Sequence, residues 1–194
     1  KTDVSSMARS PELIALEGAG TALMGHNKEA LDLLTQLEVA NDPASQLWAG
    51  LAAQSDGNAE EARVRFDRGA QALSDFWPQQ RAIFLLANAG AALELNDDFL
   101  AQSLAKRARD DAQDAVTKAQ AELLLARALY KSGRADEALE SLNILEKNSD
   151  REVAARAKFE KAIIGMETGK VSPADSIRAL DALRYAWRGD EFEI

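Results

Sequence analysis

A short segment that recurs five times constrains the fold of this chain more than any other feature. Each copy opens with Gly or Asn, which tolerate a left-handed backbone, and has Ala five positions later. The opening residues, spaced 32, 39, 37 and 36 positions apart, are Gly25, Gly57, Asn96, Gly133 and Gly169. Seven positions before each of them lies another small residue, namely Gly18, Gly50, Ala89, Ala126 and Ala162. The pattern predicts five helix pairs, each joined by a tight turn and crossing closely at the small residues.

The composition favours helices over strands. The 194 residues include 38 Ala and 25 Leu but only 6 Val and 7 Ile, and Ala and Leu lose less on entering a helix than β-branched residues do. All four prolines fit the first position of a helix, where a missing amide proton costs nothing. They are Pro11, Pro43, Pro78 and Pro173, and Ser or Asp precedes three of them as a candidate N-cap.

We therefore predict an all-α fold of ten helices. Their expected ranges are 11–24, 28–40, 43–55, 59–74, 78–95, 98–112, 116–131, 135–147, 150–167 and 173–188. Apolar spacing supports the second helix, in which Leu31, Leu34 and Leu37 share one face. Aromatic residues at helical spacing are expected to pack in the core, namely Trp48, Phe66, Phe84, Phe99 and Phe159.

The repeated unit resembles the tetratricopeptide repeat (TPR). That family has a unit of about 34 residues, with a small residue in the first helix, a turn Gly, an Ala after the turn and a bulky apolar residue in the second helix. The clearest copies here read Gly18…Gly25…Ala30…Leu34, Gly50…Gly57…Ala62…Phe66 and Ala126…Gly133…Ala138…Leu142. The family's aromatic residues in the first helix are mostly missing, Asn96 replaces a turn Gly, and Pro173 shifts the start of the last helix.

The resemblance covers residues 11–188 and implies one domain, a right-handed TPR-like α-solenoid of about five hairpins. We expect the hairpins at 11–40, 43–74, 78–112, 116–147 and 150–188, after an N-terminal extension over 1–10. Residues 189–194 should begin a further helix or form a C-terminal tail, because Gly189, Asp190 and Glu193 match a helix end followed by a capping box. Residues 183–190 also resemble a segment of bacterial repeat proteins.

The charge balance disfavours two classes of partner. The net charge is −9, and an acidic surface repels phosphate backbones and anionic lipid headgroups. No uninterrupted apolar stretch reaches the length of about 18 residues that a membrane span needs. We therefore expect no nucleic acid partner and no membrane insertion. The chain has no Cys, which says nothing about the compartment, so the cytoplasm and the periplasm both stay open.

Residues that could carry catalysis or bind a metal are scarce. Without Cys, and with His26 as the single His, neither a catalytic triad nor a His-rich metal site has a basis. The Asp pairs at 97–98 and 110–111 lack the ligand spacing of a calcium loop and fit helix ends instead. The integrin-type tripeptide at 188–190 is read more simply as a helix end and the next cap. We predict no enzyme, no catalytic residue, no metal site and no cofactor.

The resemblance also implies where a partner would bind. In TPR proteins the first helices of the pairs line the concave face. In the fourth and fifth pairs these helices would present Arg127, Tyr130, Lys131, Arg156 and Phe159 there. Arg beside aromatic side chains is typical of interface hot spots, so these five residues are the candidate partner-binding residues. In the alternative, Tyr130 and Phe159 pack between repeats and the cations are solvated.

Two functions fit such an array. The first is a non-enzymatic protein–protein interaction scaffold that binds a peptide or helix of a partner protein on the concave face. The alternative is a structural spacer or assembly segment of a larger bacterial envelope or motility protein. The last predicted helix carries Ile177, Leu180, Leu183 and Trp187, so the solenoid should either continue beyond this chain or form a homodimer through its C-terminal end. In the alternative, Phe192 and Ile194 fold back over these side chains as a cap.

Overall fold

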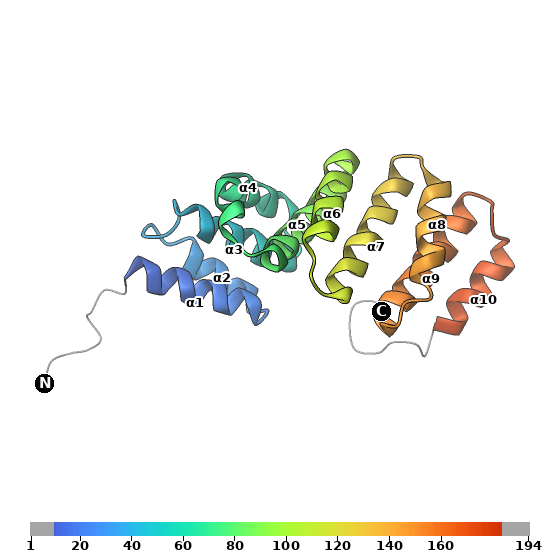
Figure 1. Cartoon of the computed structure of the whole chain (residues 1–194), viewed down its shortest axis with the longest axis horizontal. Helices are drawn as coiled ribbons and strands as arrows, with labels where there is room; N and C mark the ends of the chain where they lie inside the picture. Colours follow the sequence, from blue (N-terminus) through green and yellow to red (C-terminus); the bar gives the residue numbers. More distant parts are fainter. Residues whose placement is uncertain (1–9, 184–194) are drawn as a thin grey trace, which may run out of the picture.

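The computed structural model describes residues 10–183, which Figure 1 shows as helical hairpins stacked along one long axis. The helices are α1 (Pro11–Leu23), α2 (Asn27–Leu34), α3 (Pro43–Ser55), α4 (Ala59–Gly69), α5 (Pro78–Glu94), α6 (Asp98–Asp111), α7 (Ala115–Lys131), α8 (Ala135–Leu145), α9 (Arg151–Glu167) and α10 (Pro173–Leu183), with a 3₁₀ helix η2 (Ala70–Asp75) after α4. The prediction of an all-α fold with five hairpins is confirmed for the described residues.

Some predictions lie outside the described residues. These are the N-terminal extension up to residue 9, the end of the last helix at 184–188, and the tripeptide and capping pattern at 188–193. The position of Trp187 in the proposed C-terminal contact and the cap by Phe192 and Ile194 lie outside them as well.

Each hairpin turns at the residue that the repeated segment indicates. The φ angles are 77°, 80°, 84° and 69° at the four turn glycines and 60° at Asn96. Backbone amides just after the turn bond back to the end of the first helix. Arg134 N, for example, donates to the Leu129 carbonyl at 2.9 Å, and Gly133 N donates to the Tyr130 carbonyl at 2.9 Å. These bonds satisfy carbonyls that the helix end would otherwise leave open.

Replacing Gly133 with Ala should lower the free energy of unfolding by about 1 kcal/mol. Open space surrounds the position, so the cost comes from the strain of a Cβ at φ 84° and not from a clash. Gly133→Asn should cost less, because Asn tolerates this conformation and Asn96 already adopts it. Urea unfolding followed by circular dichroism measures both variants. An equal loss for the two would show that the backbone angle does not limit this position.

The second helix is shorter than predicted. α2 ends at Leu34, and residues 35–42 form turns. In a continued helix Val39 would lie about 140° around the axis from Leu34 and face away from the core. Because the helix ends, Val39 returns to the core, where it is 2% exposed, while Leu37 is 90% exposed. The predictions that this helix reaches residue 40 and that Leu37 shares its buried face are therefore wrong.

Small residues allow the two helices of a pair to approach closely. A Cβ added to Gly18 would lie 2.6 Å from Leu34 Cγ, and one added to Gly50 would lie 2.9 Å from the ring of Phe66. The Ala that follows the turn is buried in the first four pairs; these residues are Ala30, Ala62, Ala101 and Ala138. The repeated segment therefore marks real helix crossings in these four pairs.

The fifth hairpin departs from this pattern. Ala174 is exposed although it lies five positions after Gly169, and Ser176 is fully buried instead. α10 begins at Pro173, four positions after its turn residue, whereas each of the other second helices begins two positions after its own. The two extra residues shift the buried face, so the expectation that this Ala marks the crossing is wrong for the last pair.

The aromatic side chains divide between core and surface. Phe66 and Phe84 are buried, as expected. Phe99 is 83% exposed, so the prediction that it packs in the core is wrong. The buried face of α6 includes Ala101 and Leu104. Phe99 lies two positions before Ala101, about 200° around the helix, and therefore points outward.

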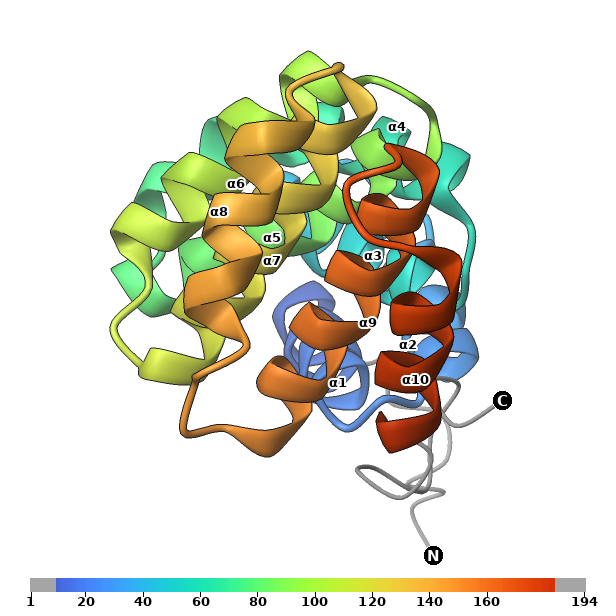
Figure 2. The same ribbon diagram turned by 90° about the vertical axis from the view of Figure 1, so that its right-hand side faces the viewer.

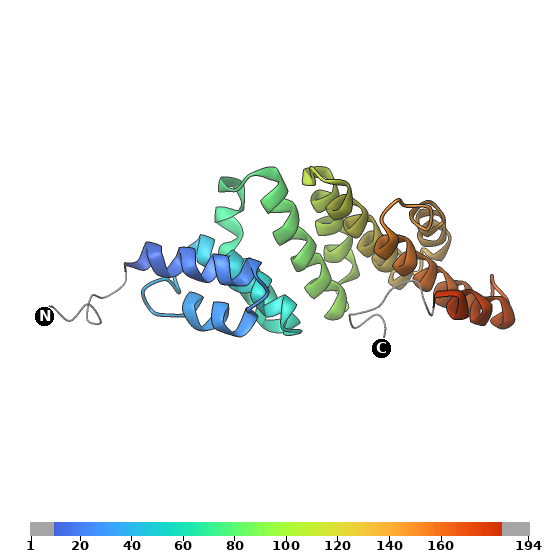
Figure 3. The ribbon, with the colours of Figure 1, turned by 90° about the horizontal axis from the view of Figure 1, so that it is seen from below.

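The first helices of the hairpins form a continuous layer. Each of α1, α3, α5 and α7 contacts the next first helix, and each second helix also contacts the first helix that follows it. Second helices of neighbouring pairs make no comparable contact in residues 10–183. The first helices thus pack side by side, whereas the second helices of neighbouring pairs lie apart. Successive hairpins are therefore turned relative to one another, as Figures 2 and 3 show. None of the described helices is both long and apolar enough to cross a bilayer.

Candidate interaction surface

A strip of open positions runs along the first helices. Counted back from the turn residue, positions 6, 9 and 13 are exposed or half-buried in all five first helices. Position 7 is buried in every one, because it faces the second helix of its own pair. We call these exposed or half-buried residues the inner strip. Position 6 is Ala19, Leu51, Gly90, Arg127 and Ile163; position 9 is Leu16, Trp48, Ala87, Leu124 and Glu160; and position 13 is Glu12, Ala44, Ile83, Gln120 and Arg156.

The chemistry of the inner strip changes along the array. Apart from Glu12, the residues that α1, α3 and α5 contribute are apolar or small. α7 and α9 contribute Gln120, Arg127, Arg156 and Glu160 among their six residues. A segment lying along the strip would therefore contact an apolar surface over the first three hairpins and a charged surface over the last two.

Two of the predicted partner-binding residues, Arg127 and Arg156, belong to the inner strip. Arg127 Nε lies 3.2 Å from Glu160 Oε1, an ion pair that joins α7 to α9. Arg156 Nε donates to Glu152 Oε1 at 3.0 Å, one helical turn earlier on α9. Phe159, which precedes Glu160, is 38% exposed. The structure therefore places Arg127 and Arg156 on either side of Glu160, near the junction of α7 and α9.

The other two predicted residues contact neighbouring hairpins. Tyr130 is half-buried against the core, and its hydroxyl donates to the Glu167 carboxylate on α9. Lys131 Nζ donates to the Leu93 carbonyl at 3.0 Å and to Asn96 Oδ1 at 3.2 Å, at the turn between α5 and α6. Both side chains hold successive hairpins together. Tyr130 thus packs between repeats, as the alternative interpretation expects, while Lys131 is bonded and not merely solvated.

Glu160 is a charged group largely withdrawn from water. Burial raises the pKa of its carboxyl, and the positive charges of Arg127 and Arg156 oppose this effect only in part. The nearby Glu167 raises the pKa further. The two arginines of the inner strip therefore stabilise the ionised form of Glu160.

Replacing Arg127 with Gln should raise the pKa of Glu160 further, because one of its two compensating cations is lost. The variant should be less stable than the parent protein at neutral pH. This difference should fade as the pH falls through the pKa of Glu160, since a protonated carboxyl needs no cation. Carbon-detected NMR titration of the Glu side chains and thermal melts at several pH values measure both effects.

Arg178→Gln is the matched control for this variant, because Arg178 lies on α10 and pairs with Asp175 while largely exposed. We expect no change in the pKa of Glu160 in the control. An Arg127→Gln variant whose stability loss is the same at every pH would show that the ion pair does not carry the effect.

The apolar end of the inner strip is hollowed into a pocket of about 530 Å³. Its walls are formed by α1, α3, the loop over residues 35–42 and the segment before α5. The large or medium apolar side chains that line it are Leu16, Val39, Trp48 and Phe76. A volume of this size lies within the range of pockets that hold ligands or bulky side chains.

Three aromatic rings support the pocket. The ring centroids of Trp48 and Phe84 lie 4.7 Å apart, and those of Phe76 and Phe84 lie 5.0 Å apart, both in edge-to-face geometry. Phe84 is 1% exposed, whereas Trp48 and Phe76 are half-buried and line the pocket. Trp48 packs against the core through Phe84, as predicted, but it is only half-buried and also lines the pocket. Trp48 lies nine residues before its turn, the position that the exposed Leu16 occupies on α1.

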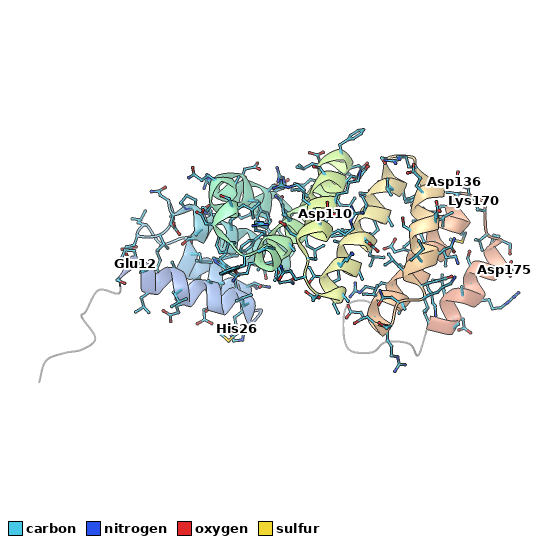
Figure 4. The ribbon with its side chains drawn as sticks, viewed as in Figure 1. Glu12, His26, Asp110, Asp136, Lys170 and Asp175 are labelled. Atoms are coloured by element: carbon cyan, nitrogen blue, oxygen red, sulfur yellow. The ribbon has the colours of Figure 1, made fainter. Side chains whose placement is uncertain are left out.

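The remaining sequence motifs have structural contacts. His26 is exposed at the turn between α1 and α2 (Figure 4), and its Nδ1 lies 3.6 Å from Glu29. Asp97 caps the N-terminus of α6. Asp111 accepts two hydrogen bonds from the Arg81 guanidinium at 2.8 and 2.9 Å, and this cation holds the pKa of Asp111 below its usual value. The Asp pairs thus act at helix ends and between helices, as the sequence indicates.

The hairpins, turns and crossings described above define a TPR-like helical-repeat solenoid. The structure is similar, with a TM-score of 0.64, to that of a Podosopora anserina protein assigned as a kinesin light chain with nearly identical TPR-like repeats. The alignment covers 93% of this chain and 97% of that one at 17% sequence identity, so the likeness concerns the fold. No family model and no curated protein sequence matches this chain.

Proposed function

We propose that this protein is a non-enzymatic interaction scaffold that binds a peptide or helix of a partner protein along the concave face of its first helices. The observation that carries the proposal is the inner strip, with three rows of exposed or half-buried residues in the same register on the first helices of five consecutive hairpins. A repeat array offers such a continuous surface to an extended partner. The fold also favours this function, because TPR-like repeats typically bind proteins and are not enzymes.

The apolar half of the inner strip favours a scaffold over a spacer. A spacer that only separates other domains needs a polar surface there, since nothing covers it. Leu16 is 72% exposed, and Trp48, Leu51 and Ile83 are only partly covered. Apolar side chains gathered on one open surface beside a pocket are typical of a binding site.

A second candidate function rests on the last hairpin. On α10, Ile177 is 63% exposed, and Leu180 and Leu183 are half-buried. A further hairpin or a second copy of the chain would cover these side chains, as expected for an assembly segment of a larger bacterial envelope or motility protein. Light scattering tests this alternative, because Ile177→Lys should dissociate a homodimer that forms through the C-terminal end.

Site-specific photo-crosslinking tests the scaffold. A photoreactive phenylalanine analogue is placed at Leu16 or Gln120 on the inner strip, and at Val64 or Phe99 on the second helices as the matched control; all four side chains are exposed. In extracts of the source organism, both inner positions should give adducts with the same protein and the outer positions should give none. Adducts from the outer positions alone would contradict the proposal.

A further inference from the structure

The pocket at the apolar end of the inner strip has an acidic rim. Besides its apolar walls it is lined by Glu12, Glu38 and Asp42. No described residue that lines it carries a positive charge. Figure 4 places Glu12 where α1 begins, at the N-terminal end of the array.

The three carboxylates are held in different ways. Glu12 lies in the first turn of α1, where hydrogen bonds from its own backbone amide and from Ser10 keep the pKa of its carboxyl below the usual value. Asp42 caps α3, and its Oδ2 accepts bonds from Ser45 N at 2.8 Å and Ser45 Oγ at 2.7 Å. Glu38 is exposed on the loop over residues 35–42. All three negative charges therefore lie beside apolar walls, where the attraction for a cation is stronger than in bulk water.

We propose that this pocket binds a cationic amphipathic segment of another protein. A bulky apolar side chain of the segment fills the pocket, and neighbouring Lys or Arg side chains pair with the rim carboxylates. The inference rests on the proposed function and narrows the chemistry of the partner. The net charge of −9 also attracts a cationic segment from a distance.

The apolar walls and the acidic rim together exclude other segments. A neutral apolar segment would withdraw the rim carboxylates from water without giving them a partner, which is costly. An acidic segment would be repelled by the rim. A cationic segment without an apolar anchor would leave the walls exposed to water. The pocket therefore favours a segment that carries both a bulky apolar side chain and a positive charge.

Three synthetic peptides of about ten residues test this selection. All carry the same central Leu and Phe, flanked by Lys and Arg in the first, by Gln and Ser in the second, and by Glu and Asp in the third. Binding is measured by fluorescence anisotropy at low and high salt. We expect the cationic peptide to bind about tenfold more tightly than the neutral one, with an advantage that shrinks at high salt. The acidic peptide should bind most weakly.

Emission from Trp48 reports whether the peptide enters the pocket. The chain contains three Trp, so Trp77→Phe with Trp187→Phe leaves Trp48 as the single emitter. The cationic peptide should shift its emission, since Trp48 lines the pocket. Binding with no change in Trp48 emission would overturn the proposal, because the peptide would then bind elsewhere.

Charge-reversal variants distinguish the effect of the rim carboxylates on peptide binding from the effect of the net charge of the protein. Glu12→Lys with Glu38→Lys should abolish the preference for the cationic peptide. Glu140→Lys with Asp181→Lys changes the net charge equally at exposed positions on α8 and α10 and should preserve it. Equal binding of the three peptides, or equal loss in the two double variants, would overturn the proposal. The crosslinking result on the inner strip would be unaffected, so this failure differs from a failure of the scaffold function.

Residues 1–9 of this chain are the competing occupant, because they contain Lys1 and Arg9 together with Val4 and Met7. Removing them should leave the affinity for the cationic peptide unchanged. A rise of about tenfold or more would assign the pocket to this segment and overturn the assignment to a partner.

Discussion

Replacing Phe84 with Ala should lower the free energy of unfolding by about 3–5 kcal/mol, a large share of the stability of an ordinary domain. The ring is 1% exposed and contacts Trp48 and Phe76 edge to face. Its removal leaves a cavity behind the pocket that helices α3 and α5 cannot easily close. Urea unfolding followed by circular dichroism measures the loss.

Two further variants make this result specific. Phe84→Leu keeps most of the apolar volume and should cost much less than Phe84→Ala. Phe99→Ala removes the same side chain from an exposed position on α6 and should change the stability by less than about 0.5 kcal/mol. If Phe84→Ala and Phe99→Ala had similar effects, the three-ring cluster would contribute little to the fold.

Replacing Ala138 with Phe should lower the free energy of unfolding by about 1–3 kcal/mol, because the larger ring overpacks the crossing between α7 and α8. Ala138 is fully buried in the core and follows the turn at Gly133 by five positions. The helices of this pair would have to separate to admit the ring. A thermal melt of the purified variant, compared with the parent protein, measures the effect.

Ala174→Phe is the matched control, because Ala174 follows Gly169 by the same five positions but is exposed. The two extra residues of the last turn account for this difference, so the control should melt close to the parent protein. An unchanged melting temperature for Ala138→Phe would contradict the crossing at this position. A large loss for Ala174→Phe would contradict the shifted frame of the last hairpin.

The candidate site was predictable only at its charged end. The family resemblance points to five residues, of which the structure places Arg127 and Arg156 beside Glu160 near the α7–α9 junction. That any of the five binds a partner stays a prediction. The pocket at the other end was missed, because Trp48 in isolation is equally compatible with a core position. The register counted back from the turns makes Trp48 equivalent to Leu16, but only the structure shows that this position is exposed on α1 and half-buried on α3.

The sequence by itself determined the helices, the turns and most of the crossings. Turn residues such as Gly133 and Asn96 act through their own φ angles, and caps such as Asp42 act on the next few amides, so these signals are local. The tertiary structure decided where α2 ends, because burial of Val39 against other helices outweighs a continued helical pattern. It also decided the pocket, whose walls come from α1, α3, the loop that leads into α3 and the segment before α5, spread over residues 11–76. Packing between such segments depends on the relative placement of whole hairpins, and no local pattern of residues carries that information.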